Sequence, residues 1–216
     1  MGDSSFDPER FSGIVPVFPL PNVVLFPGMF LPLHIFEPRY RQMVGDALGG
    51  DRIIGMVLLR PGWEPAYNER PPIYPIGCAG VITHSEQLSD GRFNIILRGM
   101  EKFRVVAEDD ALPYRVAHVE SVREPPPESF RDAMRGARRR LESLLVPQPV
   151  GRAEPKMPAA MPDEELVNAI AQYMEFEPVE KQALLEREGL LARCRSLIEL
   201  LEMKVLVARK QWGAGH

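Results

Sequence analysis

Histidine and cysteine are the side chains that most often carry nucleophilic or metal chemistry, and this chain has few of them. They are widely separated in sequence: His34, His84, His118, His216, Cys78 and Cys194. No two histidines stand three or four residues apart on a predicted helix, and no Cys-x-x-Cys pair occurs, so the spacing supports neither a zinc site nor a disulfide framework. We therefore expect no metal, and we expect both thiols to be reduced and buried.

Two common enzyme motifs are also absent from the sequence. No glycine is followed by lysine, which excludes the Gly-Lys-Ser/Thr loop whose backbone amides hold nucleotide phosphates. No Gly-x-Ser-x-Gly elbow occurs that would present a nucleophilic serine. Hydrolysis is therefore not the expected activity, and the sequence indicates no cofactor.

One segment concentrates basic residues and offers a candidate surface for RNA or an acidic partner. Its arginines are Arg131, Arg135, Arg138, Arg139 and Arg140. Apolar side chains recur at helical spacing on the other face of the same predicted helix, between residues 130 and 144. We interpret the arginines as the solvated face of an amphipathic helix, and keep a basic binding patch as the alternative.

The elements that must position any site begin with the stretch from Val15 to Tyr40, which is mostly apolar yet contains six prolines. It can form neither a continuous helix nor a central strand, and short edge or barrel strands joined by stiff turns remain. Pro27-Gly28 predicts a type II turn, because glycine accepts the positive φ that this turn requires. A strand from Phe30 to Ile35 should follow.

A helix should begin directly after this strand, with Pro38 in its first turn and Gly49-Gly50 at its end. Arg39 is expected to face outward from it. Glu37 could act as an acid or base, but we interpret it as a residue that stabilises the helix N-terminus and pairs with an arginine.

The next segments read as strands and one long loop. Asp90-Gly91 is a strong hairpin signal between two strands, and the loop is rich in proline and carries Trp63 and Tyr67. The predicted strands are Ile53 to Leu59, Ile76 to His84, Phe93 to Leu97, Lys102 to Ala107 and Arg115 to Val122, with the loop at Arg60 to Pro75.

The composition changes from strand-like to helix-like at Pro125-Pro126-Pro127, which we take as a domain boundary. The predicted fold is α+β: an N-terminal β pseudo-barrel with a short helix, followed by a C-terminal α-helical bundle. Its parts are a loose leader (1–13), the barrel (14–124) and the bundle (128–212) with a Pro-rich connector (147–162). The bundle helices should run from about 130 to Val146, from a cap at Asp163, from Pro178, and from Leu190 to about Arg209, the last burying Leu190, Cys194, Leu197, Leu201, Val205 and Ala208.

Charge and hydropathy restrict the partners. The formal net charge is -4 and the charges are mixed, which disfavours nucleic acid as a general partner. The N-terminus is acidic and no apolar run approaches the ~20 residues that cross a membrane, so we expect a cytoplasmic protein without a membrane segment.

Several motifs occur in a fixed order along the chain. They are Val17-Phe18-Pro19-Leu20, Leu25-Phe26-Pro27-Gly28, Leu31-Pro32-Leu33, Ile35-Phe36-Glu37-Pro38-Arg39-Tyr40, Ile76-Gly77-Cys78-Ala79, Asp90-Gly91-Arg92-Phe93-Asn94-Ile95, Arg98-Gly99, Phe103-Arg104-Val105, and Lys181-Gln182 with Leu184-Leu185-Glu186. In these the chain resembles the substrate-binding N-terminal domain of the Lon ATP-dependent proteases in its free-standing bacterial form, over roughly Ile14 to Arg209. We expect neither the ATPase nor the serine-lysine peptidase of full Lon.

The resemblance implies that the β pseudo-barrel is PUA-like. It also implies a non-catalytic module that binds unfolded or misfolded polypeptides, acting as an adaptor or in a chaperone-like way. A partner protease or chaperone, and the oligomeric state, are left open. The family motif and the aromatic loop place the predicted recognition surface at Glu37, Arg39, Tyr40, Trp63 and Tyr67. A small-molecule-binding or enzymatic barrel, which a polar concave site would favour, and an RNA-binding PUA-like protein are the alternatives.

Overall fold

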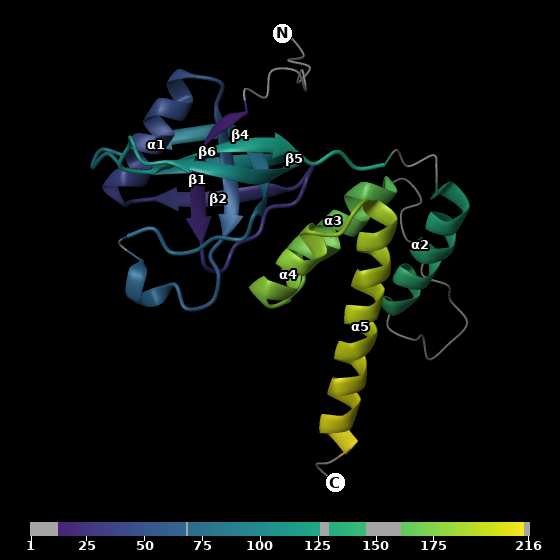
Figure 1. The fold of residues 1–216 in the computed structure, drawn as a ribbon. Coiled ribbons are helices and arrows are strands. Elements are labelled where there is room, and N and C mark those ends of the chain that lie inside the picture. Colours follow the sequence, from purple (N-terminus) through teal and green to yellow (C-terminus); the bar gives the residue numbers. More distant parts are fainter. Residues whose placement is uncertain (1–12, 68, 126–129, 146–160, 214–216) are drawn as a thin grey trace. The chain divides into compact units, whose positions relative to one another are not determined.

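The computed structural model describes residues 13–67, 69–125, 130–145 and 161–213, and its fold is α+β (Figure 1). The chain divides into two compact units. The first comprises Met1–Arg123 together with Phe176–Leu185, and the second comprises Glu124–Glu175 and Glu186–His216. Nearly all of the predicted leader and connector lies outside the described residues.

Strands belong to the first unit, and helices to both. The strands are β1 (Ile14–Leu20), β2 (Phe30–Ile35), β3 (Ile53–Leu58), β4 (Ile76–Gln87), β5 (Phe93–Asp109) and β6 (Arg115–Ser121). The helices are α1 (Pro38–Gly49), the short 3₁₀ turn η2 (Glu64–Ala66), α2 (Arg131–Leu145), α3 (Asp163–Tyr173), α4 (Pro178–Leu185) and α5 (Leu190–Gly213).

The strands pair in the order β2-β5-β4-β3-β1-β6, and a further pairing of β5 with β6 closes the sheet on itself. Strand β1 runs parallel to β3, with Val17 opposite Gly55, and antiparallel to β6. Among the described strands, β2 pairs only with β5, so it forms an open edge, and Pro32 lies within it opposite Ile96. Proline suits such an edge because it has no N–H to contribute to a further ladder.

A buried cluster fills the interior of the first unit around the ring of Phe103. Its members are Val15, Val17, Ile53, Val57, Ala79, Phe103, Ala117 and Val119. Gly77 lies against this ring: a Cβ added there would approach Phe103 Cζ to 2.6 Å and also collide with the carbonyl oxygen of Met56. Gly77 is thus needed for packing.

The predicted turn at Pro27-Gly28 is confirmed. Met29 N donates to Phe26 O at 3.2 Å, and Gly28 has φ 78°, as a type II turn requires. The turn also bonds to β5 through Gly99, whose N–H donates to Met29 O at 2.8 Å and whose carbonyl accepts from Gly28 N at 2.9 Å. A side chain on Gly99 would collide with the carbonyl of Phe26, so the glycine permits this close approach.

The hairpin at Asp90-Gly91 is confirmed, but the prediction of two separate strands after it is wrong. Residues 93–109 form the single strand β5, 17 residues long. The strand continues through Gly99 because it pairs in succession with β2, β4 and β6, and a bulge after Val105 adjusts the last pairing.

Helix α4 is grouped with the first unit, whereas its apolar pattern predicts it in the helical bundle. Two buried polar side chains explain the grouping. Gln182 Nε2 donates to Ile76 O at 2.9 Å, and Lys102 Nζ donates to Leu185 O at 3.2 Å at the C-terminal end of the helix. A lysine at this end also compensates the negative end of the helix dipole.

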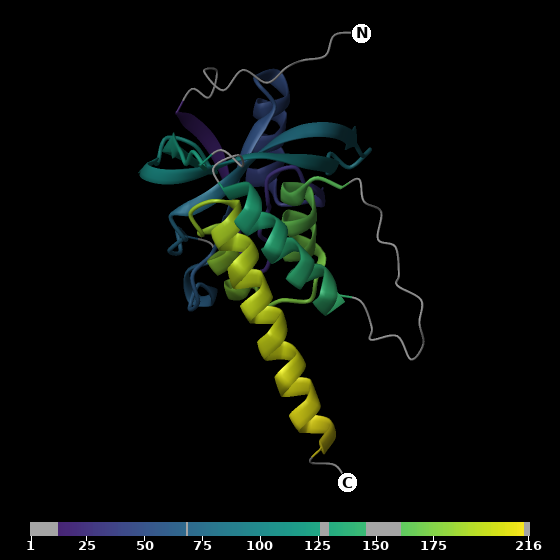
Figure 2. The ribbon, with the colours of Figure 1, turned by 90° about the vertical axis from the view of Figure 1, so that its right-hand side faces the viewer.

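In the second unit, α2 and α5 lie side by side (Figure 2). Arg193 of α5 is completely buried; its guanidinium donates to Asn168 Oδ1 of α3 at 2.8 Å and forms an ion pair with Glu124. This arginine, which the sequence analysis does not single out, connects three separate segments of the unit.

Two predictions about the helical segments are wrong. Asp163 is the first residue of α3 and not its N-cap, which is Pro162. The Asp163 carboxylate accepts a hydrogen bond from Arg138 NH1 at 2.7 Å. Leu190 is half-buried and Val205 is 38% exposed, although the apolar spacing predicts that both are buried. The predicted burial of Ala208 lies outside the described side chains. None of the helices among the described residues is both long enough and apolar enough to cross a membrane.

Candidate functional site

The start of α1 and the loop between β3 and β4 meet in the first unit. Arg39 Nε donates to Glu37 Oε2 at 3.0 Å, and the Tyr67 hydroxyl donates to Glu37 Oε1 at 2.5 Å. Arg39 NH2 also reaches the carbonyl oxygen of Tyr67 at 3.5 Å. Glu37 therefore fastens the loop to the helix through both of its carboxylate oxygens.

Aromatic rings enclose the Arg39 guanidinium. Its Cζ lies 4.7 Å from the ring centroid of Tyr40 and 5.2 Å from that of Tyr67, both within cation-π range. Trp63 packs edge-on against Tyr67, with centroids 5.4 Å apart. The structure thus brings all five residues of the predicted recognition surface together, from positions up to 30 residues apart in sequence.

One sequence-based expectation is confirmed here and another needs correction. The predicted pairing of Glu37 with an arginine is confirmed, and Glu37 is the N-cap residue of α1, although Arg39 and Tyr67 occupy its oxygens and it makes no side-chain cap hydrogen bond. Arg39 does not face outward as a free surface charge: its side chain is only 21% exposed, between the two rings.

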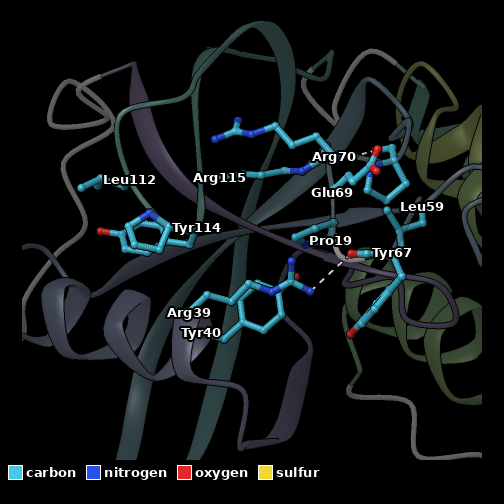
Figure 3. A pocket seen from close by; sticks show the side chains of 12 residues that line it. Pro19, Arg39, Tyr40, Leu59, Tyr67, Glu69, Arg70, Leu112, Tyr114 and Arg115 are labelled. Atoms are coloured by element: carbon cyan, nitrogen blue, oxygen red, sulfur yellow. Dashed lines mark hydrogen bonds between the residues drawn. The ribbon is translucent and has the colours of Figure 1, made fainter. Parts of the chain in front are cut away.

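A cavity of about 230 Å³ opens beside this cluster (Figure 3). Arg39, Tyr40 and Tyr67 form part of its wall, while Arg70 and Arg115 contribute two further guanidinium groups. The remaining lining residues are Pro19, Leu59, Glu69, Pro71, Leu112, Pro113 and Tyr114. Sequence reasoning missed Arg70 and Arg115, because no local motif links a loop arginine to the first residue of β6.

The two added arginines are held by different partners. Arg115 is buried; its NH2 donates to Pro71 O at 2.6 Å and its NH1 to Glu108 Oε2 at 3.2 Å. Arg70 is more exposed and pairs with Asp110 at 2.6 Å, while its NH1 also donates to Asp109 O at 3.1 Å. Burial lowers the pKa of Arg115, and Arg70 and Arg39 lower it further, against the opposing effect of Glu108.

Tyrosine hydroxyls near the cavity are kept uncharged. Burial raises the pKa of Tyr40 to about 12, with the Glu37 carboxylate adding to the effect and Arg39 opposing it. Burial likewise raises the pKa of Tyr114 to about 12, helped by its hydrogen bond of 2.8 Å to Asp46 Oδ2.

We expect the free energy of unfolding to fall between pH 10 and pH 12. Tyr40 binds its proton more tightly in the folded state than the ordinary pKa of 10, so its contribution is complete below about pH 10 and is lost as pH rises through about 12. In the Tyr40→Phe variant, the total loss of unfolding free energy between pH 10 and pH 12 should be about 2 kcal/mol smaller than in the parent, as measured by urea denaturation. The control is Tyr173→Phe, at an exposed tyrosine of α3; equal slopes for both variants would contradict the prediction.

The arginines of α2 form several internal ion pairs. Arg138 contacts Glu142 at 2.8 Å and Asp163 at 2.7 Å, and Arg140 contacts Glu202 at 2.6 Å. Arg135 lies 3.5 Å from Asp132, and Arg131 and Arg139 are exposed. These pairs reduce the positive charge that the segment presents to a polyanion.

Residues suited to metal or thiol chemistry are not gathered into a site in the described part of the chain. No group of three or more His, Cys, Asp or Glu side chains there is placed to hold a metal ion. Cys78 and Cys194 are buried and form no disulfide, as predicted, and burial raises the pKa of the Cys194 thiol to about 11.

Solved structures share this fold. The N-terminal domain of a Mycobacterium avium complex Lon protease superposes with a TM-score of 0.61 at 16% identity, over 88% of this chain and 98% of that one. A Lon N-terminal domain protein from Xanthomonas campestris gives a TM-score of 0.56 at 21% identity, over 86% and 97%. The fold is therefore of the class seen in Lon N-terminal domains.

A family model, "ATP-dependent protease La (LON) substrate-binding domain", matches residues 14–203, and the chain belongs to this family. Lon protease 2 of Myxococcus xanthus is 28% identical over 202 residues, 91% of this chain and 24% of that protein. Lon protease of Dictyoglomus thermophilum is 31% identical over 112 residues, 51% of this chain and 14% of that protein. The chain thus spans about a quarter or less of the length of these relatives, and the match covers the substrate-binding domain.

Proposed function

We propose that this chain binds extended segments of unfolded or misfolded polypeptide, without chemical turnover, at the surface formed by Glu37, Arg39, Tyr40, Trp63 and Tyr67. Membership of the Lon substrate-binding family makes a polypeptide ligand plausible. The observation that carries the proposal is the convergence of these five side chains beside one cavity, whose wall includes Arg39, Tyr40 and Tyr67. An adaptor or chaperone-like role would follow from such binding.

The residue types suit peptide recognition. Tryptophan, tyrosine and arginine dominate the binding energy of protein interfaces, because each covers a large area and lies in a well-packed setting. Here Trp63 is half-buried against Tyr67, and Tyr67 is fixed in turn by Glu37. A surface ordered in this way loses little conformational entropy when it binds.

A small polar ligand in the same cavity is the second candidate, since the cavity is concave and lined by three guanidinium groups. RNA binding along α2 has less support, because Arg138 and Arg140 already pair with carboxylates. The PUA-like description of the barrel stays a prediction from the sequence.

Trp63→Ala should weaken binding of a fluorescently labelled unfolded polypeptide by more than about fivefold, or about 1 kcal/mol, the loss typical of an interface aromatic. Fluorescence anisotropy measures this affinity, and calorimetry should show a nearly unchanged melting temperature.

The matched control is Tyr173→Ala, which removes an exposed aromatic side chain from α3 and should leave affinity unchanged. Undiminished binding by Trp63→Ala, combined with weakened binding by Arg139→Glu, would refute the proposed surface and place the site on α2.

A further inference from the structure

Three arginines from three separate elements line the cavity beside the proposed recognition surface. Arg39 comes from α1, Arg70 from the loop before β4, and Arg115 from the start of β6 (Figure 3). Arg115 is 6% exposed, and its electrostatic interactions with Arg70 and Arg39 are unfavourable. The fold therefore holds positive charges close together at a place where burial already disfavours them.

The carboxylates that compensate these charges lie outside the cavity wall. Glu37, Glu108 and Asp110 pair with the arginines but are not lining residues, and Glu69 supplies the single carboxylate of the lining. Asp110 is 82% exposed at its side chain, so its pair with Arg70 is largely solvated and costs little to exchange. An anion inside the cavity could therefore replace Asp110 as the partner of the Arg70 guanidinium.

The other walls are apolar or aromatic. Pro19, Leu59 and Leu112 line the cavity together with the rings of Tyr40 and Tyr114. A ligand with a negative charge beside an apolar group would match these arginines and apolar walls. A guanidinium fork matches the geometry of a carboxylate through two parallel hydrogen bonds, which gives orientation as well as affinity.

We propose that this cavity binds a carboxylate of the polypeptide ligand, with the neighbouring apolar side chain packed against Leu59 and Leu112. The proposal deepens the proposed function and rests on it. Two parts of a polypeptide supply this chemistry, the C-terminal carboxylate and the side chains of Asp and Glu. The recognition surface around Trp63 would then hold the adjoining extended segment.

The test uses labelled unstructured decapeptides ending in leucine, made as the free acid, as the C-terminal amide, and as the amide with one internal glutamate. Fluorescence anisotropy measures the affinity of each for the full chain. Because charge-assisted hydrogen bonds are the strong ones, the parent should bind at least one carboxylate peptide about tenfold more tightly than the plain amide.

Arg70→Gln is the informative variant, since Arg115 is buried and its replacement endangers folding. Arg70→Gln should reduce the preference for carboxylate to less than about threefold. Arg60→Gln is the matched control: Arg60 lies in the same loop and contacts Ile73 O at 3.0 Å, and it does not line the cavity, so the preference should persist.

The peptide arms identify the source of the carboxylate. Preference for the free acid assigns the cavity to a chain terminus, and preference for the glutamate peptide assigns it to acidic side chains. Either preference supports the proposal if the Arg70→Gln variant loses it. Equal binding of all three peptides, weakened by Trp63→Ala, would overturn the carboxylate proposal and leave the proposed function standing. Failure of every peptide, and of unfolded polypeptide, to bind would overturn both.

Discussion

Gly77→Ala should lower the free energy of unfolding of the first unit by about 3 kcal/mol, the upper end of the usual cost of overpacking. The new methyl group would lie 2.6 Å from Phe103 Cζ and 2.8 Å from Val57 Cγ1, and it would meet the backbone carbonyl of Met56. A backbone oxygen within a paired strand cannot move aside as a flexible side chain does, so the strands themselves must shift.

Calorimetric unfolding measures this loss. The matched control is Gly45→Ala, because Gly45 lies in α1 with open space around the added methyl group. Alanine is favoured over glycine in a helix by roughly 0.5–1 kcal/mol, so this control should be slightly more stable than the parent. A Gly77→Ala protein as stable as the Gly45→Ala protein would show that the packing around Phe103 is looser than the structure describes.

Arg193→Leu should destabilise the second unit by about 3 kcal/mol or more. Arg193 is fully buried and binds both Asn168 and Glu124, and removing one member of a buried ion pair leaves the other charge without that compensation. Urea denaturation followed by far-ultraviolet circular dichroism reports on the helices of this unit.

The control for this variant is Arg195→Leu, two residues further along the same helix at an exposed position. It should change stability by less than about 0.5 kcal/mol, as is usual for surface substitutions. Equal effects of the two substitutions would mean that the buried network contributes nothing beyond the burial of an aliphatic side chain.

Local signals predicted most of the elements correctly. Proline and glycine restrict the backbone directly, which is why the turn at Gly28, the start of α1 at Pro38 and the hairpin at Gly91 are where the sequence indicates. The strand Ile53–Leu58 was equally clear, because a short β-branched apolar run suits a strand buried on both faces.

The remaining features depend on contacts distant in sequence. Gly99 looks like the end of a strand until its close approach to Phe26 is known, so β5 was divided wrongly. The grouping of α4 depends on hydrogen bonds across 83 and 106 residues. Periodicity shows that such a helix has an apolar face but not which surface covers it.

The candidate site shows the same division. Glu37, Arg39 and Tyr40 lie in a contiguous family motif, and Trp63 and Tyr67 stand out as aromatic residues in a long loop, so sequence alone indicated them. Arg115 is the first residue of an ordinary strand. Only the pairing of β6 with β1 and β5 brings it to the cavity, and no single sequence reveals that pairing.

The first unit is built from two separate segments of the chain, which has a consequence for synthesis on the ribosome. Residues 1–123 emerge well before Phe176–Leu185, which belong to the same unit. At ordinary translation rates the intervening chain and α4 take about 3–12 s to make, far longer than small domains usually need to fold. During that interval the hydrogen bonds of Ile76 with Gln182 and of Lys102 with Leu185 cannot form. The nascent first unit therefore lacks its contacts with α4 until that helix has been synthesised.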